Sequence, residues 1–302
     1  MKKIGRVGVL MGGPSAEREI SLKSGQAVYQ ALKQHGLDVV RLDLGTRAQE
    51  QIKRSKISLA FIALHGSFGE DGRIQGILES LGIPYTGSGV MASYLCLDKI
   101  ASRRIFEHHG LAVPQYIVLE RKFYKQKSRD LKIELPVVVK PVSLGSSIGI
   151  TFVDQKSKFN PAINTAFKYD QTVIIEQYLS GREITVGILN DRPLPVVEIL
   201  PEPRFFDFQA KYEKGRTRYV VPAQLTAAQY QLAQKTARLA HRVLGCRVFS
   251  RVDMILTKPG PVILEVNSIP GLTTTSLLPM AAQARGISFT QLCLKIIKST
   301  LT

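Results

Sequence analysis

The sequence has 302 residues, of which 44% are hydrophobic and 22% charged, as in an ordinary globular protein. Its formal net charge is +17, and the excess of Lys and Arg is spread over the whole chain. We interpret this excess as general basicity, because no nucleic-acid-binding signature accompanies it. No apolar run approaches the length of a membrane-spanning helix, so we expect no membrane partner.

The cysteines exclude two further classes of protein. Cys96, Cys246 and Cys293 are widely spaced, odd in number and not arranged as Cys-x-x-Cys pairs. This pattern indicates neither a disulfide framework nor a zinc site. It favours a reducing, cytoplasmic compartment.

The first part of the chain predicts strands that alternate with helices. Residues 4–11, 39–44 and 59–64 are apolar and predict strands, and Ser15 is the predicted N-cap of a helix that ends near Gln34. Glycines and an arginine interrupt the first run, so we do not interpret it as a secretion signal. The alternation predicts a doubly wound α/β unit with a parallel sheet.

Loops that follow parallel strands are where such sheets bind ligands. The loops that contain Glu17 and His65 both qualify. His65 taken alone is more simply a capping or packing histidine.

The middle of the chain contains two candidate nucleotide-binding segments. A helix is predicted from Asp98 and Lys99 to about residue 110, and residues 114–119 predict a short strand. A buried strand over residues 135–141 then delivers Lys140 to a glycine- and serine-rich turn. Such a turn can fold its backbone N–H groups over phosphate oxygens, although it is more often a plain hairpin. A strand over residues 172–176 ends at Glu176.

Two further strands are predicted within residues 183–199, and the first of them begins at Glu183. Glu176 and Glu183 could bind an exocyclic amine and ribose hydroxyls, or could be ordinary surface carboxylates. Residues 201–222 are polar, basic and aromatic without clear periodicity, and we interpret them as an active-site flap. Helices are expected over residues 226–245 and 288–301.

Two apolar runs near the end of the chain flank a turn at residues 258–260 and predict an antiparallel hairpin. If Thr257 lies opposite Pro261, four polar side chains share one face. They form two opposed pairs: Asp253 with Glu265, and Arg251 with Asn267. Opposed carboxylates destabilise a ladder unless a cation lies between them, and these oxygen ligands suit Mg²⁺. The alternative is two surface carboxylates beside an arginine.

The order of these segments resembles that of D-alanine–D-alanine ligases in the ATP-grasp superfamily. The matching segments are residues 12–22, 64–72, 82–89, 98–99, 139–149, 210–212, 251–253 and 265–273. The resemblance implies three α/β domains, with ATP between the second and third. These would be an N-terminal substrate domain (1–95), a central ATP-grasp subdomain (96–187) and a C-terminal Mg²⁺-binding domain (188–302) with a flap at about 203–222.

The resemblance also implies a role for individual residues. ATP would be bound by Lys99, Lys140, Ser146, Ser147, Glu176, Tyr178, Leu179, Glu183 and Lys211. Two Mg²⁺ ions, with Mn²⁺ as a substitute, would be bound by Asp253, Glu265 and Asn267, and Glu265 would bridge them. One departure is Gln177, where many relatives carry a cationic residue.

The substrate and catalytic residues follow in the same way. Glu17 would hold the ammonium of the first D-alanine, and His65 would lie near the reacting centre. Ser276 and Leu277 would hold the carboxylate of the second D-alanine. Arg251 and the Gly271 backbone would stabilise the oxyanion. Tyr212 would link Glu17 to Ser146.

The activity implied is ATP-dependent ligation of two D-alanines through a D-alanyl phosphate, which releases ADP and phosphate and serves peptidoglycan precursor synthesis. Tyr212 favours the dipeptide, because relatives that make the D-lactate ester usually lack it. Ligation of D-alanine to D-lactate or D-serine, or another ATP-grasp ligation, is the alternative. An inactive homologue is disfavoured by the retained set of Asp253, Glu265 and Asn267. The family further suggests a homodimer formed through the N-terminal domain.

Overall fold

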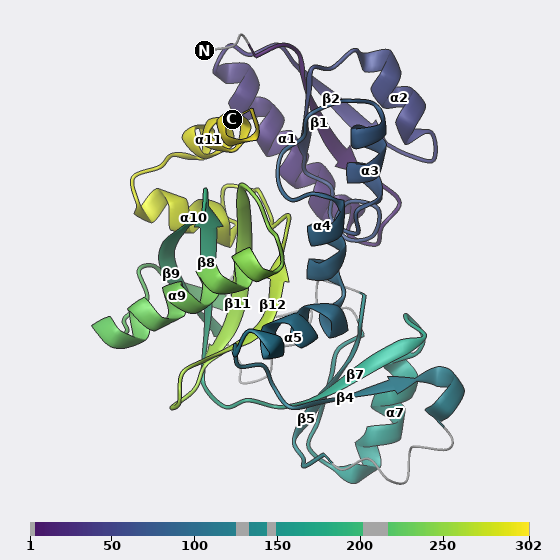
Figure 1. Ribbon diagram of the computed structural model, residues 1–302, viewed down its shortest axis with the longest axis vertical. Helices are drawn as coiled ribbons and strands as arrows, with labels where there is room; N and C mark the ends of the chain where they lie inside the picture. The colour runs from purple at the N-terminus through teal and green to yellow at the C-terminus, as the bar shows by residue number, and fades with distance from the viewer. Residues whose placement is uncertain (1–3, 125–132, 144–148, 202–216, 302) are drawn as a thin grey trace.

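The computed structural model describes residues 4–124, 133–143, 149–201 and 217–301. Its strands form three sheets, one parallel and two antiparallel, each covered by helices (Figure 1). The expected mixed α/β architecture is therefore confirmed.

The N-terminal sheet is parallel, as predicted, with the strand order β2-β1-β3. Its strands and helices are β1 (Val7–Gly12), α1 (Arg18–Gln34), β2 (Val39–Leu44), α2 (Ala48–Ser55), β3 (Leu59–Ile62) and α3 (Arg73–Ser80). Alternate residues of β1 face opposite sides, because strand side chains alternate. Val7 and Val9 join the core beside α1, whereas Leu10 joins the core beside α2 and α3.

Ser15 does not cap α1, contrary to the sequence prediction. The N-cap is Glu17, and no side chain caps the helix. The Ser15 hydroxyl instead accepts a hydrogen bond from the Glu17 backbone N–H and donates one to the His65 carbonyl at 2.7 Å. Ser15 therefore joins the two candidate ligand loops, a contact that sequence spacing does not reveal.

Two helices connect the N-terminal sheet to the rest of the chain: α4 (Val90–Leu97) and α5 (Lys99–His108). Asp98 separates them and caps α5, because its carboxylate accepts hydrogen bonds from the backbone N–H groups of Ile100 and Ala101, both at 2.9 Å. The predicted helix start at Asp98 and Lys99 is therefore confirmed. Lys99 is the first residue of α5 and is buried.

The central sheet is antiparallel, with the order β4-β7-β5-β6. Its elements are β4 (Tyr116–Glu120), the short 3-10 helix η1 (Arg121–Phe123), β5 (Val137–Pro141), β6 (Thr151–Val153), α7 (Lys156–Ala166) and β7 (Thr172–Gln177). Helix α7 covers one face, where Ile163 packs against Val137 and Ile175. Lys140 and Glu176 lie on the adjacent strands β5 and β7, and both are buried.

The third sheet has five antiparallel strands in the order β10-β9-β8-β11-β12. Its elements are β8 (Arg182–Leu189), β9 (Arg192–Pro201), β10 (Thr217–Val220), α9 (Ala227–Val243), β11 (Phe249–Leu256), β12 (Pro261–Asn267) and α10 (Leu277–Ala284). Strand β10 corrects one prediction, because it pairs with β9 inside the segment that we interpreted as flap. The rest of that segment, residues 202–216, lies outside the described residues.

The last helix, α11 (Phe289–Thr300), packs against the N-terminal unit although it follows the third sheet in the chain (Figure 1). Ile296 and Leu292 of α11 share a core with Val28 and Leu32 of α1. The same core contains Leu278 of α10. The two ends of the sequence are therefore joined by one continuous apolar cluster.

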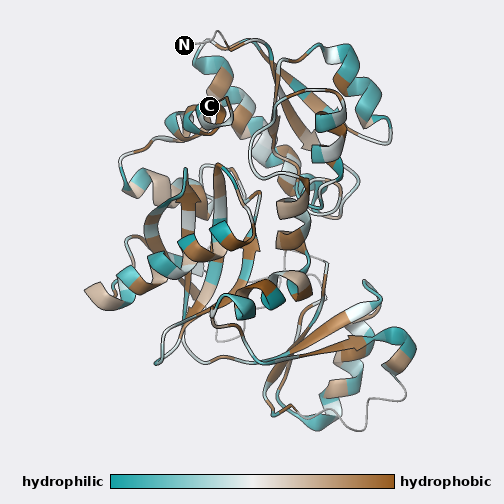
Figure 2. Ribbon diagram, in the orientation of Figure 1, coloured by the Kyte–Doolittle hydropathy of each residue, from teal (hydrophilic) through white to brown (hydrophobic). Residues whose placement is uncertain are grey.

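Hydropathy follows this arrangement. The strands are mostly hydrophobic, whereas the outer helix α2 is mostly hydrophilic (Figure 2). Among the described residues, no helix has both the length and the apolar character needed to cross a membrane.

We expect Ile296→Ala to destabilise the protein by about 2–5 kcal/mol, because it leaves a cavity in a fully buried site. Urea denaturation would measure the loss. Lys295→Ala is the matched control, because Lys295 is an exposed residue of the same helix and its removal should cost less than about 0.5 kcal/mol. Equal effects of the two variants would show that α11 is not part of the core.

Candidate active site

The hairpin of β11 and β12 places four polar residues together, but not by the register that the turn predicts. Leu256, and not Thr257, lies opposite Pro261. The register then shifts by one between Asp253 and Met254, with Leu264 as the extra residue of β12. Beyond this β-bulge, Asp253 lies opposite Glu265 and Arg251 lies opposite Asn267, as predicted. A hairpin without the bulge would place Asp253 opposite Leu264 and turn Glu265 to the other face.

The Asp253 carboxylate accepts hydrogen bonds from three side chains. Arg251 donates two hydrogen bonds to its carboxylate, at 2.8 and 2.7 Å. Thr185, its neighbour on β8, donates a third at 2.6 Å, and the side-chain amide of Asn267 donates a fourth at 3.0 Å. Hydrogen bonds to a charged group are stronger than neutral ones, so this carboxylate fixes the position of Arg251.

Glu265 faces the start of α5. The Lys99 ammonium lies 3.6 Å from a Glu265 carboxylate oxygen, and the Lys99 side chain is only 6% exposed. The Asp98 cap and the β12 strand together hold this pair in place. A cation predicted to contact phosphate therefore lies beside a carboxylate predicted to bind metal.

Two carboxylates from the N-terminal unit approach the same region. Glu70 accepts a hydrogen bond from the Gly66 backbone N–H at 2.7 Å. Gly66 has a φ of +67°, and a Cβ atom there would lie 2.5 Å from a Glu17 carboxylate oxygen. A side chain at this position would be strained by the positive φ and would displace the Glu17 carboxylate.

His65 connects the N-terminal loop with the loop that follows β12. Its Nε2 lies 3.0 Å from the Ser24 hydroxyl, and its ring also hydrogen-bonds to the Ile269 backbone. The Ser24 hydroxyl in turn accepts a hydrogen bond from the Leu272 backbone N–H at 3.3 Å. Burial lowers the pKa of His65 to about 4, so the ring is neutral at pH 7. These contacts fit the packing role first considered for His65.

The pKa shifts of Glu70 and His65 indicate which of these residues lie near one another. Burial, followed by the charge of Glu17, raises the pKa of Glu70 to about 8, and Glu265 and Arg251 also act on Glu70. Arg251 further lowers the pKa of His65. Residues from the N-terminal loops and from the third sheet are thus within electrostatic reach of one another.

A second charged cluster is buried in the central sheet. Glu176 contacts Lys140 at 2.5 Å and also forms an ion pair with Arg103 of α5. Burial raises the pKa of Glu176, but Lys140 and Arg103 outweigh it and hold that pKa below its usual value. Burial lowers the pKa of Lys140 to about 8, although Glu176 opposes this. The charge of Lys99 also lowers the pKa of Lys140, so Lys99 links the two clusters.

The remaining predicted nucleotide residues lie along the junction between the central and third sheets. The exposed Tyr178 packs its ring edge-on against Phe152, with centroids 5.0 Å apart, and its backbone N–H donates to the Pro136 carbonyl at 3.0 Å. Leu179 follows it and is half-buried, and Glu183 is the second residue of β8. The exposed Gln177 ends β7.

The predicted acceptor-binding residues lie at the N-terminus of α10. Ser276 is the N-cap and Leu277 is the first helical residue. The Ser276 hydroxyl lies 2.7 Å from the Thr273 hydroxyl and accepts a hydrogen bond from the Thr273 backbone N–H. A Cβ atom on Gly271 would lie 2.9 Å from that hydroxyl, so the loop passes close to Ser276. A helix N-terminus favours a carboxylate.

Comparison with known proteins identifies the family. The family described as "D-ala D-ala ligase C-terminus" matches residues 105–298, and "D-ala D-ala ligase N-terminus" matches residues 41–88. The chain is 47% identical to a D-alanine–D-alanine ligase of Geotalea uraniireducens over 98% of its own length and 95% of the relative's.

The chain belongs to the D-alanine–D-alanine ligase family.

Solved structures agree with this assignment. The D-alanine–D-alanine ligase of Bacillus anthracis is similar with a TM-score of 0.87 and 37% identity, over 98% of this chain and 97% of that one. A structure of the Bacillus anthracis ligase complexed with ATP is similar with a TM-score of 0.84 and 34% identity, over the same shares of both chains. The VanG D-Ala:D-Ser ligase of Enterococcus faecalis matches with a TM-score of 0.85 and 30% identity, over 99% and 100% of the two chains. The predicted ATP-grasp fold is confirmed by these similarities.

Four residues to which the ligase family resemblance assigns roles lie outside the described residues: Ser146, Ser147, Lys211 and Tyr212. Three residues that the sequence prediction left without a role do belong to the two clusters. Glu70 lies in a matched ligase family segment, and its neighbours Gly69 and Gly72 gave a signal for it. Arg103 and Thr185 gave no such signal, because their partners Glu176 and Asp253 lie 73 and 68 positions away in the sequence.

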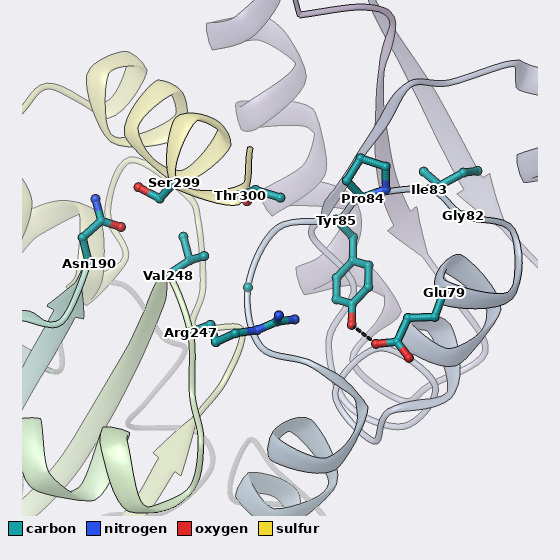
Figure 3. Close-up of a pocket in the computed structure, with 11 residues that line it drawn as sticks. Glu79, Gly82, Ile83, Pro84, Tyr85, Asn190, Arg247, Val248, Ser299 and Thr300 are labelled. Atoms are coloured by element: carbon teal, nitrogen blue, oxygen red, sulfur yellow. Dashed lines mark hydrogen bonds between the residues drawn. The ribbon is translucent and has the colours of Figure 1, made fainter. Parts of the chain in front are cut away.

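A cavity of about 870 Å³ lies apart from the residues expected to act in a ligase. It is lined by Tyr85 and Glu79 of the N-terminal unit and by Arg247, Val248 and the end of α11 (Figure 3). The Tyr85 hydroxyl donates a hydrogen bond to Glu79 at 2.6 Å. Among the described residues, none of the predicted site residues lines this cavity.

Glu70→Gln should become progressively more stable relative to the unchanged protein as the pH rises from about 5 to 8. The folded chain holds the Glu70 proton up to a pKa of about 8, and an ordinary glutamate loses it near 4.5. The folded state therefore binds more protons in this window, and its stability falls with rising pH. Urea denaturation at several pH values would measure the difference.

Glu50→Gln is the control for this experiment, because Glu50 is an exposed carboxylate on α2. Its stability difference from the unchanged protein should not vary with pH. A pH-independent difference for Glu70→Gln as well would contradict the raised pKa.

Proposed function

We propose that the protein ligates two D-alanines at the expense of ATP, forming D-alanyl-D-alanine, ADP and phosphate. The observation that carries this proposal is the convergence of Glu17 and Glu70 with Arg251 and Glu265, next to Lys99. It places carboxylates suited to a substrate ammonium beside cations suited to phosphates. Membership of the ligase family supports the same conclusion.

The first step is an attack of one anion on another. The carboxylate of the first D-alanine attacks the γ-phosphorus of ATP, giving a D-alanyl phosphate and ADP. Catalysis of such a transfer is mostly charge neutralisation and positioning. We propose that Lys99 and Lys140 contact the phosphates. Both are buried, so their charges act where solvent screening is weak. Serines 146 and 147 would cover the phosphates, with Lys211 on the γ-phosphate.

The residues expected to bind metal fit Mg²⁺ by their chemistry. Asp253 and Glu265 lie opposite each other, Asn267 is hydrogen-bonded to Asp253, and all three carry hard oxygen atoms. We propose that these three residues would hold two Mg²⁺ ions. Mg²⁺ supplies Lewis-acid neutralisation of the transferring phosphoryl group.

The second step is attack of the second D-alanine amine on the acyl carbon, with loss of phosphate. Negative charge develops on the carbonyl oxygen in this step. We propose that Arg251, held by two hydrogen bonds to Asp253, stabilises that oxygen together with the Gly271 backbone N–H. Glu17 would hold the ammonium of the first D-alanine. Ser276 and the N-terminus of α10 would hold the carboxylate of the second.

The nucleotide base would lie at the junction of the central and third sheets. We propose that Glu176 and Tyr178 border the adenine, that Leu179 provides apolar contact, and that Glu183 binds the ribose. Both oxygens of Glu176 already contact cations in the structure. Glu176 would therefore have two roles, to recognise the adenine and to position Lys140.

We further propose the cellular setting that the family resemblance implies. The dipeptide would serve peptidoglycan precursor synthesis, and hence cell shape, in the cytoplasm. The chain would divide into residues 1–95, 96–187 and 188–302, and would form a homodimer through the first part. Size-exclusion chromatography with light scattering would test the dimer.

A panel of acceptors tests the proposed reaction. Purified protein with ATP, Mg²⁺ and D-alanine should release phosphate and form D-alanyl-D-alanine, detected by mass spectrometry. D-lactate should be a poorer acceptor, because Tyr212 is of the dipeptide-forming type and relatives that make the D-lactate ester usually lack it. D-alanine should also be preferred over D-serine. The similarity to a D-Ala:D-Ser ligase makes D-serine the second candidate. A preference for D-serine or D-lactate would overturn the assignment of D-alanine as acceptor.

Glu265→Gln should lower the ligation rate by roughly 100-fold or more with little loss of stability, because it removes a charge that would bind metal. Phosphate release under saturating ATP would measure the rate, and the urea midpoint would report folding. Glu50→Gln is the matched control at an exposed position and should keep full activity. An active, well-folded Glu265→Gln protein would refute the metal assignment.

A further inference from the structure

Two of the three cysteines lie side by side in the folded chain. The Cys96 and Cys246 sulfur atoms are 3.3 Å apart, although the residues are 150 positions apart in sequence. Cys96 lies in the last turn of α4, and Cys246 lies in the loop that precedes β11. Both are free thiols that are 6% and 8% exposed. The sequence pattern had excluded a disulfide framework, and the fold creates a pair that spacing could not reveal.

The distance is short enough for bond formation. A disulfide needs a sulfur–sulfur distance of about 2.05 Å, so the atoms must approach by roughly 1.3 Å. The third cysteine, Cys293, provides the contrast. It is fully buried in α11 and has no cysteine neighbour among the described residues.

The surroundings of the two sulfurs differ, because the Ser88 hydroxyl contacts Cys246 in addition to the Cys96 thiol. A hydrogen bond from the Cys96 thiol lowers the pKa of Cys246, and one from the Ser88 hydroxyl adds to this, although burial of Cys246 opposes it. The hydrogen bond to Cys246, followed by burial, raises the pKa of Cys96. The Ser88 oxygen itself accepts a hydrogen bond from the Arg247 backbone N–H at 3.2 Å, so its proton remains available to the sulfur.

A cavity that could admit a small oxidant is lined by residues adjacent in sequence to the pair and to Ser88. The cavity of Figure 3 is lined by Gly87 and Arg247, the chain neighbours of Ser88 and Cys246. The Arg247 side chain is exposed. A peroxide in this cavity would contact Arg247, the residue that follows Cys246 in the chain.

We propose that Cys96 and Cys246 are a redox modification site that closes to a reversible disulfide when the protein meets a peroxide. The Cys246 thiolate attacks a peroxide oxygen, giving a sulfenic acid and, after protonation of the leaving oxygen, water. The Cys96 thiol then attacks the sulfenic sulfur and expels a second water, which forms the sulfur–sulfur bond. Two thiols are oxidised, one hydrogen peroxide is reduced, and a dithiol reductant reverses the change.

The position of the bond links it to the site. Cys96 is three residues before Lys99, and only Leu97 and the helix cap Asp98 lie between them. A sulfur displacement of roughly 1 Å at the end of α4 therefore reaches the start of α5. Displacements of that size can lower a catalysed rate by about 100-fold. This consequence rests on the proposed contact of Lys99 with ATP, whereas the disulfide itself does not.

The test is oxidation of the full-length protein with hydrogen peroxide, followed by a thiol count in denaturant and peptide mapping without reductant. The count should fall from three to one, and the peptides that contain Cys96 and Cys246 should be cross-linked. Dithiothreitol should restore three thiols. Cys293→Ser is the matched control and should form the same cross-link. Loss of thiols without this cross-link, or no loss, would overturn the proposal.

Two further measurements separate the disulfide from its effect on the site. Cys96→Ser and Cys246→Ser should each abolish the cross-link. If either variant fails to fold, peptide mapping of the unchanged protein decides whether the disulfide forms. The oxidised protein should ligate D-alanine at least about threefold more slowly, with recovery in dithiothreitol. An unchanged rate in a fully cross-linked sample would refute the coupling to Lys99. A reduced protein without ligase activity would refute only the proposed function.

Discussion

The site depends on a single irregularity, the β-bulge at Leu264. The turn of the hairpin sets a register in which the acidic residues of β11 and β12 would not lie opposite each other. The bulge shifts this register by one residue and brings Asp253 opposite Glu265. Two carboxylates opposite each other cost stability in an ordinary ladder. The structure offsets this cost by surrounding Asp253 with three donor side chains and by placing Lys99 beside Glu265. Side chains from three different strands and one helix therefore stabilise the two opposed carboxylates.

The charges of the site form a connected system, and Lys99 is its link. On one side, Glu176 keeps Lys140 paired in a buried position where the ammonium alone would be costly. On the other side, Arg251 forms an ion pair with Asp253 and also acts on the Glu70 carboxylate contributed by an N-terminal loop. Each cation is thus supplied with a counter-ion inside the protein. An incoming polyanion would compete with the protein's own carboxylates for these cations. The positive charges that it meets are balanced by side chains and not by bulk water.

Sequence reasoning succeeded where the determinant was local. The parallel N-terminal strands, the Asp98 cap and the apolar runs of the last hairpin all depend on neighbouring residues, and each was found. It failed where a distant group decides the outcome. Ser15 has the chemistry of a cap, yet the His65 carbonyl engages its hydroxyl.

The candidate site shows the same division. Glu70 sits in a recognisable glycine-rich segment, but its raised pKa depends on burial and on Glu17, which no spacing predicts. Arg103 and Thr185 lie within an ordinary helix and an ordinary strand, and their roles exist only because the sheets meet. The bulge is the clearest case. The correct pairing was predicted from an incorrect turn, because the one-residue error at the turn and the inserted Leu264 cancel.

The packing of α11 on α1 has a consequence for the order of folding during synthesis. The apolar face of α1 is covered in part by Leu292, Cys293, Ile296 and Ile297, which the ribosome adds more than 250 residues later. Domains generally fold as units as they emerge. Here the earliest sheet emerges with one side of its core incomplete. That side must remain exposed, or be covered by another protein, until α10 and α11 arrive and seal it.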